Sequence, residues 1–291
     1  MKLRKIMIPF VETGTCDAAF EAGLVLARHF EAHLDVVHAR PRIVLPAGLY
    51  YPVVVPYVES NYDALSEAVA KAARELNTRF SELCETHGIT ALDSDKEALQ
   101  PGLSASWNEY EARSVYDLSD RARLRDLTVM VRPEDADRRD EYGLMEAILF
   151  GSGRPLMVLG KEMRLTHVPE TIVVAWNGGR EASRALAAAQ PLLAAARSVT
   201  VLAIGETPDG DLSAGAAAAY LRLHGIAAEP RTIERDMFER AEDAMMDVIE
   251  SDKPELVVLG AYSHSRLQQT VLGGFTRHLL HDAACPVLMA H

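Results

Sequence analysis

A glycine-rich segment near the C-terminus carries the residue types best suited to chemistry. Residues 256–281 contain no Asp or Glu, although the chain has 42 acidic against 30 Lys and Arg residues. Gly260 follows an apolar run, and Gly273–Gly274 precedes a predicted helix. Glycines let backbone N–H groups approach an anion, and a helix N-terminus offers unpaired donors. The segment indicates a phosphate-binding loop; the alternative is a tight turn with solvated arginines, because no strict phosphate-loop or GxGxxG pattern is present.

Other chemistries are less well supported by the same segment. Ser263, His264 and Ser265 are adjacent, but neighbours in a loop seldom form a catalytic triad, and no G-x-S-x-G elbow is present. His278 and His281 are three residues apart without carboxylate or thiolate company, which favours a solvated helix end over a metal site. The sequence therefore predicts binding without a catalytic residue or a bound metal.

Composition limits the classes of protein that are possible. A length of 291 residues predicts two domains, and 48% hydrophobic residues exclude general disorder. The formal net charge of −12 argues against binding nucleic acid or an anionic membrane. Cys16, Cys84 and Cys285 fit neither a disulfide framework nor a zinc cluster. With no apolar signal region and no run long enough to span a bilayer, we expect a soluble cytoplasmic protein.

The chain reads as two copies of one unit. The apolar run Arg4–Pro9 and the helix-period segment after it resemble Thr171–Trp176 and its own following segment. Later, Leu127–Val131 resembles Leu256–Leu259, and Pro155–Leu159 resembles residues 286–290. The first copy carries roughly 35 extra residues, because the offset between the copies shrinks along the chain.

Each copy alternates strands with helices, and its strands read as apolar throughout. Continuous apolar runs indicate strands buried on both faces of a parallel sheet. We therefore predict an α/β fold of two tandem, doubly wound, five-stranded parallel sheets with helices on both faces, in units 1–162 and 163–291. Ligands of such sheets bind beyond the carboxyl ends of the strands. Trp107 and Tyr110, in the third predicted strand, are expected in the core.

The spacing Gly260-x2-Ser263-x9-Gly273-Gly274 resembles the universal stress protein family. Nucleotide-binding members carry G-x2-G-x9-G-(S/T) at this point, on a Rossmann-like, adenine nucleotide alpha hydrolase-like unit. The resemblance covers essentially the whole chain as two units, and the form GxYxHSRLxxxVLGGxTRHLL is similar to the tandem bacterial branch. It implies a stress-response protein that binds ATP, with or without magnesium, in its second unit and has at most slow hydrolysis.

The resemblance also implies a set of nucleotide contacts. Ser263 replaces a family glycine, Gly274 replaces a Ser or Thr, and Asn177 replaces an Asp that could help to hold magnesium. The implied contacts follow the first, second and fourth strands of the second unit: Ala175, Trp176, Asn177, Ala203, Ile204, Leu259, Gly260, Ser263, His264, Ser265, Arg266, Gly273, Gly274, Phe275 and Thr276.

The first unit departs further from the family pattern. Residues 134–137 hold three acids where a phosphate would bind, and no glycine follows Val131 until Gly143. The loop Phe10–Gly14 also lacks the family Asp. We predict a degenerate first unit kept as a packing partner; the alternative is a site of different chemistry.

An apolar, proline-rich insertion, residues 41–58, leads into a predicted helix at Ser60–His87. It could cover the other unit, pack on a partner subunit or form a lid, and we favour an interface. The second hypothesis follows: an interaction protein of the same fold that binds no nucleotide and acts through dimerisation. The partner protein is not identified by the sequence, and both an intramolecular pair of units and a homodimer fit.

Overall fold

The computed structural model describes residues 2–11, 13–43, 55–94, 102–114, 116–132, 139–205, 209–234, 240–261, 279 and 283–291. Three regions singled out above lie outside the described residues. They are the predicted contacts from Ser263 to Arg266 and from Gly273 to Thr276, residues 44–54 of the insertion, and the acidic residues 134–137.

The first half of the chain, from β1 to β6, starts with the predicted apolar run and its helix. The predicted helix at Ser60–His87 is confirmed and begins earlier, at Val55. The elements of this half are β1 Lys5–Pro9, α1 Thr13–Phe30, β2 His33–Pro41, α2 Val55–His87, β3 Ala91–Leu92, β4 Ser104–Ala112, α3 Tyr116–Ala122, β5 Leu127–Val131, α4 Arg139–Gly151 and β6 Leu156–Leu159.

The second half, from β7 to β11, repeats the same alternation with shorter connections. Its last predicted helix lies outside the described residues apart from the helical residue Leu279. The elements of this half are β7 Thr171–Ala175, α5 Arg180–Ala195, β8 Ser198–Ile204, the 3-10 helix η2 Gly210–Leu212, α6 Ala214–Leu223, β9 Ala228–Ile233, α7 Ala241–Asp252, β10 Leu256–Gly260 and β11 Val287–Ala290.

The strands form one sheet in the order β3-β4-β2-β1-β5-β6-β11-β10-β7-β8-β9. Pairing is parallel within each half, and β6 pairs with β11 antiparallel, Leu156 opposite Met289. The predicted doubly wound α/β class is confirmed. The two five-stranded sets are joined edge to edge, and the two-residue β3 adds a strand that the sequence did not predict.

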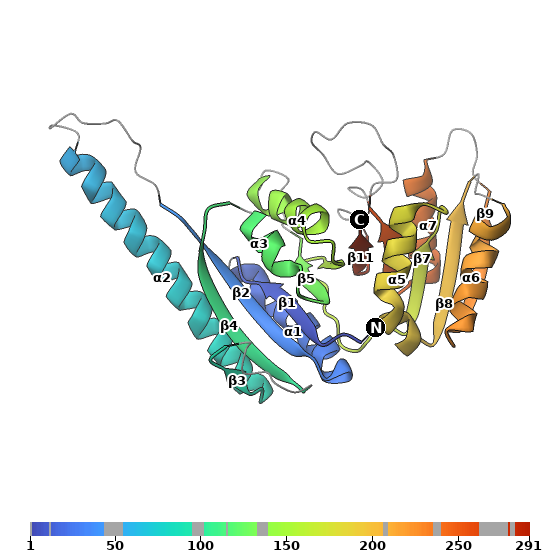
Figure 1. Ribbon diagram of the computed structural model, residues 1–291, viewed down its shortest axis with the longest axis horizontal. Helices are drawn as coiled ribbons and strands as arrows, with labels where there is room; N and C mark the ends of the chain where they lie inside the picture. The colour runs from blue at the N-terminus through green and yellow to red at the C-terminus, as the bar shows by residue number, and fades with distance from the viewer. Residues whose placement is uncertain are drawn as a thin grey trace.

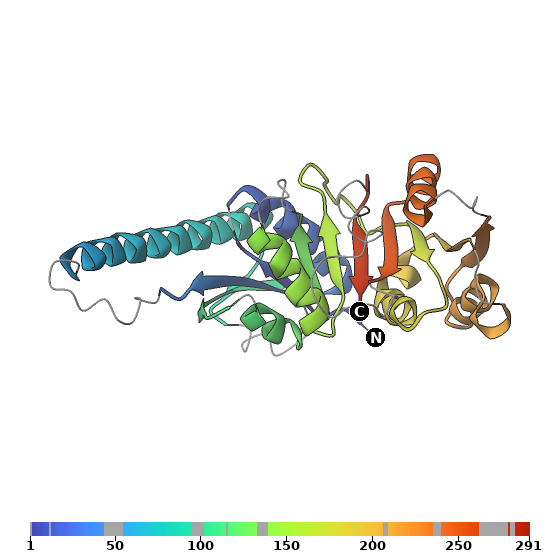
Figure 2. The same ribbon diagram turned by 90° about the horizontal axis from the view of Figure 1, so that it is seen from above.

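Helices cover both faces of this sheet (Figures 1 and 2). One core cluster includes Phe20 of α1 and Leu192 of α5, and the other includes Ile148 of α4 and Val248 of α7. Cys84 and Cys285 are buried as expected, and burial raises the pKa of these thiols to about 11 and about 12.

Three strands depart from the prediction of apolar character throughout. His33 and Asp35 in β2 are buried polar residues. In β4, most residues are polar, and Trp107 and Tyr110 are half-buried and pack against the two core clusters from outside. Strand β9 is an edge strand with four exposed residues, and its Pro230 pairs on one side only. Edge strands tolerate proline and polar residues because their outer side needs no sheet partner.

Candidate functional site

The carboxyl ends of β10, β7 and β8 lie side by side. Leu259 pairs with Ala175, which pairs in turn with Leu202, the residue before Ala203. The described members of the predicted site therefore meet at one edge of the sheet. The strand order reverses between β7 and β10, and a doubly wound sheet binds its ligands at such a reversal.

Gly260 places the end of β10 against the first turn of α5. A Cβ atom at Gly260 would lie 2.3 Å from the amide nitrogen of Ala182 and 2.4 Å from the carbonyl carbon of Glu181. Any larger residue would push the strand and the helix apart. The glycine is therefore required by backbone packing, and its predicted role toward an anion is an additional one.

The N-terminus of α5 lacks a side-chain cap. Gly179 is its N-cap residue and makes no side-chain hydrogen bond, and Gly178 adopts a positive φ of 71°. The Gly179 N–H donates to Oδ1 of Asn177 at 2.9 Å, which closes the turn before the helix. The first N–H groups of a helix have no intrahelical acceptor, so this turn presents donors beside Gly260.

Trp176 ties this edge to the loop after β8. Its backbone N–H donates to the Leu202 carbonyl at 2.8 Å, and its indole N–H donates to the Leu212 carbonyl at 2.8 Å. The ring is half-buried against the core. Trp176 therefore links β7, β8 and η2 and is well placed to report on changes at this edge.

The remaining described members of the predicted site differ in exposure. Ala203 and Leu259 are buried, at 0% and 1% exposed. Ala175 and Ile204 are half-buried on the α7 side of the sheet. Asn177 is exposed, with its side-chain oxygen engaged in the turn.

Glu181 is a residue at this edge that sequence reasoning missed. It is 8% exposed and lies in the first turn of α5, and Arg180 approaches it at 3.8 Å. Its spacing to the buried Ala185 and Ala189 places it on the inward face of the helix, which is the signal that could have found it. The backbone of Glu181 lies against Gly260, and its buried side chain belongs to the same turn of α5.

The equivalent edge of the first half is filled. The Nδ1–H of His38 donates to the Phe10 carbonyl at 2.8 Å, and the ring stacks on Trp107, with ring centroids 5.8 Å apart. A cavity of about 10 Å³ lies between the ends of β1 and β5, enough for one water at most. Its lining residues are Pro9, Val11, Thr15, Ala19, Met130, Val131 and Met145.

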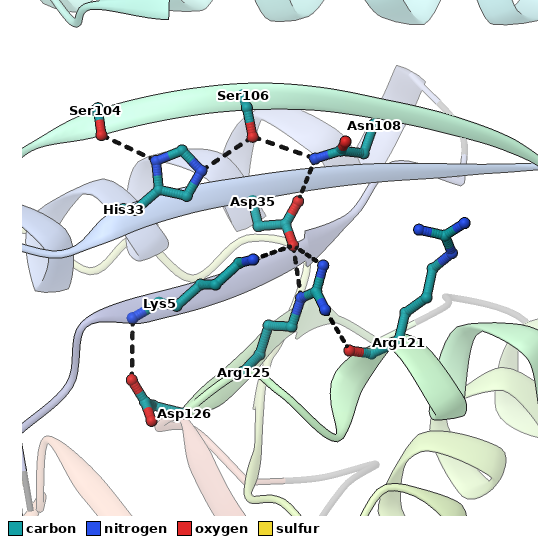
Figure 3. A network of polar contacts seen from close by, with 9 residues as sticks. All are labelled: Lys5, His33, Asp35, Ser104, Ser106, Asn108, Arg121, Arg125 and Asp126. Carbon is teal, nitrogen blue, oxygen red and sulfur yellow. Dashed lines mark hydrogen bonds and ion pairs between the residues drawn. The ribbon is translucent and has the colours of Figure 1, made fainter. Parts of the chain in front are cut away.

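A buried polar network lies at the opposite, amino-terminal edge of the first half (Figure 3). The Asp35 carboxylate is fully buried and accepts from Asn108 Nδ2 and Arg125 Nε, each at 2.6 Å, and Lys5 Nζ lies 3.6 Å away. Arg125 also donates to the Arg121 carbonyl at 2.8 Å, which fastens the end of α3.

His33 extends this network along β4. Its two ring nitrogens lie 2.9 Å from the hydroxyl oxygens of Ser104 and Ser106 (Figure 3). The second strand was predicted to be apolar, and this network was not predicted; the polar residues His33 and Asp35, two positions apart, are the sequence signal that indicates it. A satisfied buried network of this kind positions α3 and its loop on the sheet.

Within the described ranges, no group of three His, Cys, Asp or Glu side chains is arranged to hold a metal ion. No helix in the same ranges is long and apolar enough to cross a membrane.

Residues 169–291 match the model of the universal stress protein family. No curated protein matches the chain. A universal stress protein from Archaeoglobus fulgidus DSM 4304 has a similar structure, with a TM-score of 0.70 and 12% identity over 99% of this chain and 96% of that chain. A candidate universal stress protein from Pseudomonas aeruginosa UCBPP-PA14 gives 0.55 and 13% over 99% and 93%. A functionally unknown protein from Pseudomonas aeruginosa PAO1 gives 0.53 and 14% over 99% and 92%. These likenesses concern the fold.

Proposed function

We propose, since residues 169–291 belong to the universal stress protein family, that this part of the chain binds ATP at the carboxyl ends of β7, β8 and β10. Occupancy of the site would change the shape or the partners of the protein, which makes the role regulatory. The observation that carries the proposal is the contact of Gly260 with the uncapped first turn of α5.

The described residues fit a phosphate group at this edge. The backbone N–H groups of the first α5 turn lie where the acid-free segment 256–281 leaves the sheet. A helix N-terminus carries partial positive charge and stabilises an anion by roughly 0.3–1 kcal/mol at an exposed position. From the motif, Ser263, Arg266 and Thr276 would supply side-chain donors to the phosphates.

Magnesium, when bound with the nucleotide, would neutralise phosphate charge. Asn177 lacks the charge of the family Asp, and Glu181 is the acidic residue in the first turn of α5. Magnesium prefers oxygen ligands and often takes one carboxylate together with phosphates and waters.

A tryptophan titration tests the proposed site. The chain has two tryptophans, so Trp107→Phe leaves Trp176 as the sole emitter. We expect saturable ATP-dependent emission changes, confirmed by calorimetry, and affinity lowered at least tenfold by Gly273→Ala or Arg266→Ala. Gly143→Ala in α4 is the matched control, because no atom lies within 4 Å of the added Cβ. The absence of binding at millimolar ATP contradicts the proposal.

The second candidate function is an interaction protein that binds no nucleotide. The observation that favours it is the uncovered apolar surface of α2, where Leu65 is 52% exposed. Adenine nucleotide retained by the purified protein, detected by mass spectrometry, would exclude this alternative.

A further inference from the structure

Ala261 follows β10 directly, at the point where the acid-free segment leaves the carboxyl edge of the sheet. The residue is fully buried, and both of its backbone polar groups are bonded. Its N–H donates to the Ala290 carbonyl at 2.9 Å, and its carbonyl oxygen lies 3.1 Å from Nδ1 of His291. Because a carbonyl oxygen only accepts, Nδ1 of His291 carries the proton in this contact. The His291 side chain therefore holds the peptide group with which the chain leaves β10.

The ring of His291 lies against the first half of the molecule. Its centroid is 4.9 Å from that of Phe150 in α4, and the two ring planes meet at 82°, which is an edge-to-face arrangement. Helix α4 packs on β6, the neighbour of β11 in the sheet (Figure 1). Edge-to-face contact is a favoured geometry for two rings and restricts the orientation of both. A residue of the first half thus supports the imidazole that holds Ala261.

The first half has the equivalent backbone bond but lacks the imidazole. The Arg132 N–H donates to the Leu159 carbonyl at 2.8 Å, the counterpart of the Ala261 bond. Gly160 follows Leu159 at the position of His291, and a glycine has no side chain that could reach a carbonyl. The imidazole contact therefore belongs to the half that is proposed to bind ATP.

We propose that His291 is a positioning residue for the nucleotide, and that Phe150 of the first half holds its ring in place. This role rests on the proposed binding of ATP at the carboxyl ends of β7, β8 and β10. His291 acts through the Ala261 carbonyl and keeps the end of β10, including Gly260, against the first turn of α5. Affinity depends on contacts that are in place before the ligand arrives, so loss of this hydrogen bond weakens binding. The first half thereby serves the ligand position of the second.

Calorimetric titration with ATP tests the role of His291. His291→Ala should raise the dissociation constant roughly tenfold, because the buried Ala261 carbonyl loses its donor. His291→Asn should restore most of the affinity, since the Asn side chain also carries an N–H donor. Phe150→Ala should raise the dissociation constant roughly threefold, because the imidazole loses its edge-to-face support.

His224→Ala is the matched control for the loss of a histidine ring. The His224 ring also lies edge-to-face against an aromatic ring, that of Tyr220, with centroids 4.7 Å apart. His224 is at the carboxyl end of α6, which points away from the carboxyl edge of the sheet. This variant should bind ATP as the wild type does.

Amide hydrogen exchange of the nucleotide-free protein tests the contact independently of ATP. The Ala261 amide should exchange roughly tenfold faster in His291→Ala and roughly threefold faster in Phe150→Ala. It should exchange at the wild-type rate in His291→Asn and His224→Ala. Nitrogen NMR should show the neutral His291 ring protonated at Nδ1.

The two measurements separate failure of the positioning role from failure of the proposed function. A wild-type protein that binds no ATP contradicts the proposed function, and Ala261 exchange then decides whether His291 holds the end of β10. Unchanged Ala261 exchange in His291→Ala overturns the positioning role, as does unchanged affinity where the wild type binds ATP. An Asn variant that behaves like the Ala variant also overturns it. Wild-type behaviour of Phe150→Ala in both measurements overturns the contribution of the first half.

Discussion

The two halves of the molecule share an architecture but carry different residues at the carboxyl ends of their strands. Val131 is the last residue of β5, and Gly260 is the last residue of the equivalent strand β10. His38 in β2 and Ala203 in β8 are also equivalent, because each follows the last residue that pairs with the first strand of its half. In the first half Val131 lines a cavity of about 10 Å³, and His38 caps the Phe10 carbonyl. In the second half Gly260 lets the first turn of α5 pack directly against the end of β10. A few residues at the carboxyl ends of the strands therefore distinguish the two halves of one fold.

At the amino-terminal ends of the strands, the two halves share one carboxylate contact and differ in one buried ion network. Asp126 accepts the backbone N–H groups of Arg4 and Lys5 at 2.8 and 3.0 Å, and Glu255 accepts those of Glu170 and Thr171 at 2.6 and 3.4 Å. A carboxylate thus fastens the start of the first strand in each half. The buried ion network around Asp35 belongs to the first half, and Thr200 holds the equivalent position in β8.

The largest expected effect concerns this network. Asp35→Asn would leave Arg125 and Lys5 without their buried counter-charge and should lower the free energy of unfolding by about 3–5 kcal/mol. Urea denaturation measures it. Thr200→Ala in the second half is the matched control, with an expected change below about 1 kcal/mol. Similar losses in both variants would remove the distinction between the two halves.

Gly260→Ala tests the close packing of the second half. The added methyl would overlap the first turn of α5, which should cost about 2–3 kcal/mol of unfolding free energy. Gly215→Ala in α6 is the control, because the nearest atom to its Cβ is Ser213 Oγ at 3.7 Å. Alanine there should be neutral or stabilise by up to about 1 kcal/mol. A tolerated Gly260→Ala contradicts the packing role.

His38→Ala tests the filled edge of the first half. It removes the hydrogen-bond partner of the buried Phe10 carbonyl and the ring stacked on Trp107, with an expected loss of about 1–2 kcal/mol. Trp107 emission should shift as water reaches the ring, while ATP titration of Trp176 stays unchanged. His224→Ala, at an exposed position, serves as the control. A change in ATP affinity on His38→Ala would place a binding role in the first half.

The smallest effect concerns Glu255 and pH. Burial alone raises the pKa of this carboxyl, but hydrogen bonds from the N–H groups of Glu170 and Thr171 and from His167 outweigh it and lower the pKa. A depressed pKa adds stability above the unfolded value of about 4.3, and this contribution is lost as pH falls through the folded value. The stability difference between wild type and Glu255→Gln should stay below about 1 kcal/mol and shrink from pH 6 to pH 3. A difference independent of pH contradicts this assignment.

Periodicity in the sequence predicted the elements well, because apolar runs such as Leu256–Leu259 reflect burial directly. No sequence pattern indicates which strands are neighbours in the sheet, so the antiparallel pairing of β6 with β11 could not be predicted. Asp35 was missed because its partner Arg125 lies 90 residues away, and only tertiary structure shows that its charge is compensated.

The candidate site was predictable in part, because its residues follow strands that the apolar runs had located. The strand ends at Ala175–Asn177, Ala203 and Gly260 were placed at one edge by the rule for parallel sheets, and the structure brings them together. The contact of Gly260 with α5 and the burial of Glu181 could not be predicted from the sequence. Both facts depend on how a helix seats against a strand almost 80 residues away in the chain.

The pairing of β6 with β11 has a consequence for folding during synthesis on the ribosome. β11 is made about 130 residues after β6, which corresponds to about 6–25 s at roughly 5–20 residues per second. During that interval the outer edge of β6 is unpaired, and such an edge is a template for joining other chains. Translation that stalls before β11 therefore yields a chain in which the edge of β6 is free to pair with other chains. Rapid synthesis of β11 covers this edge and protects the new protein from aggregation.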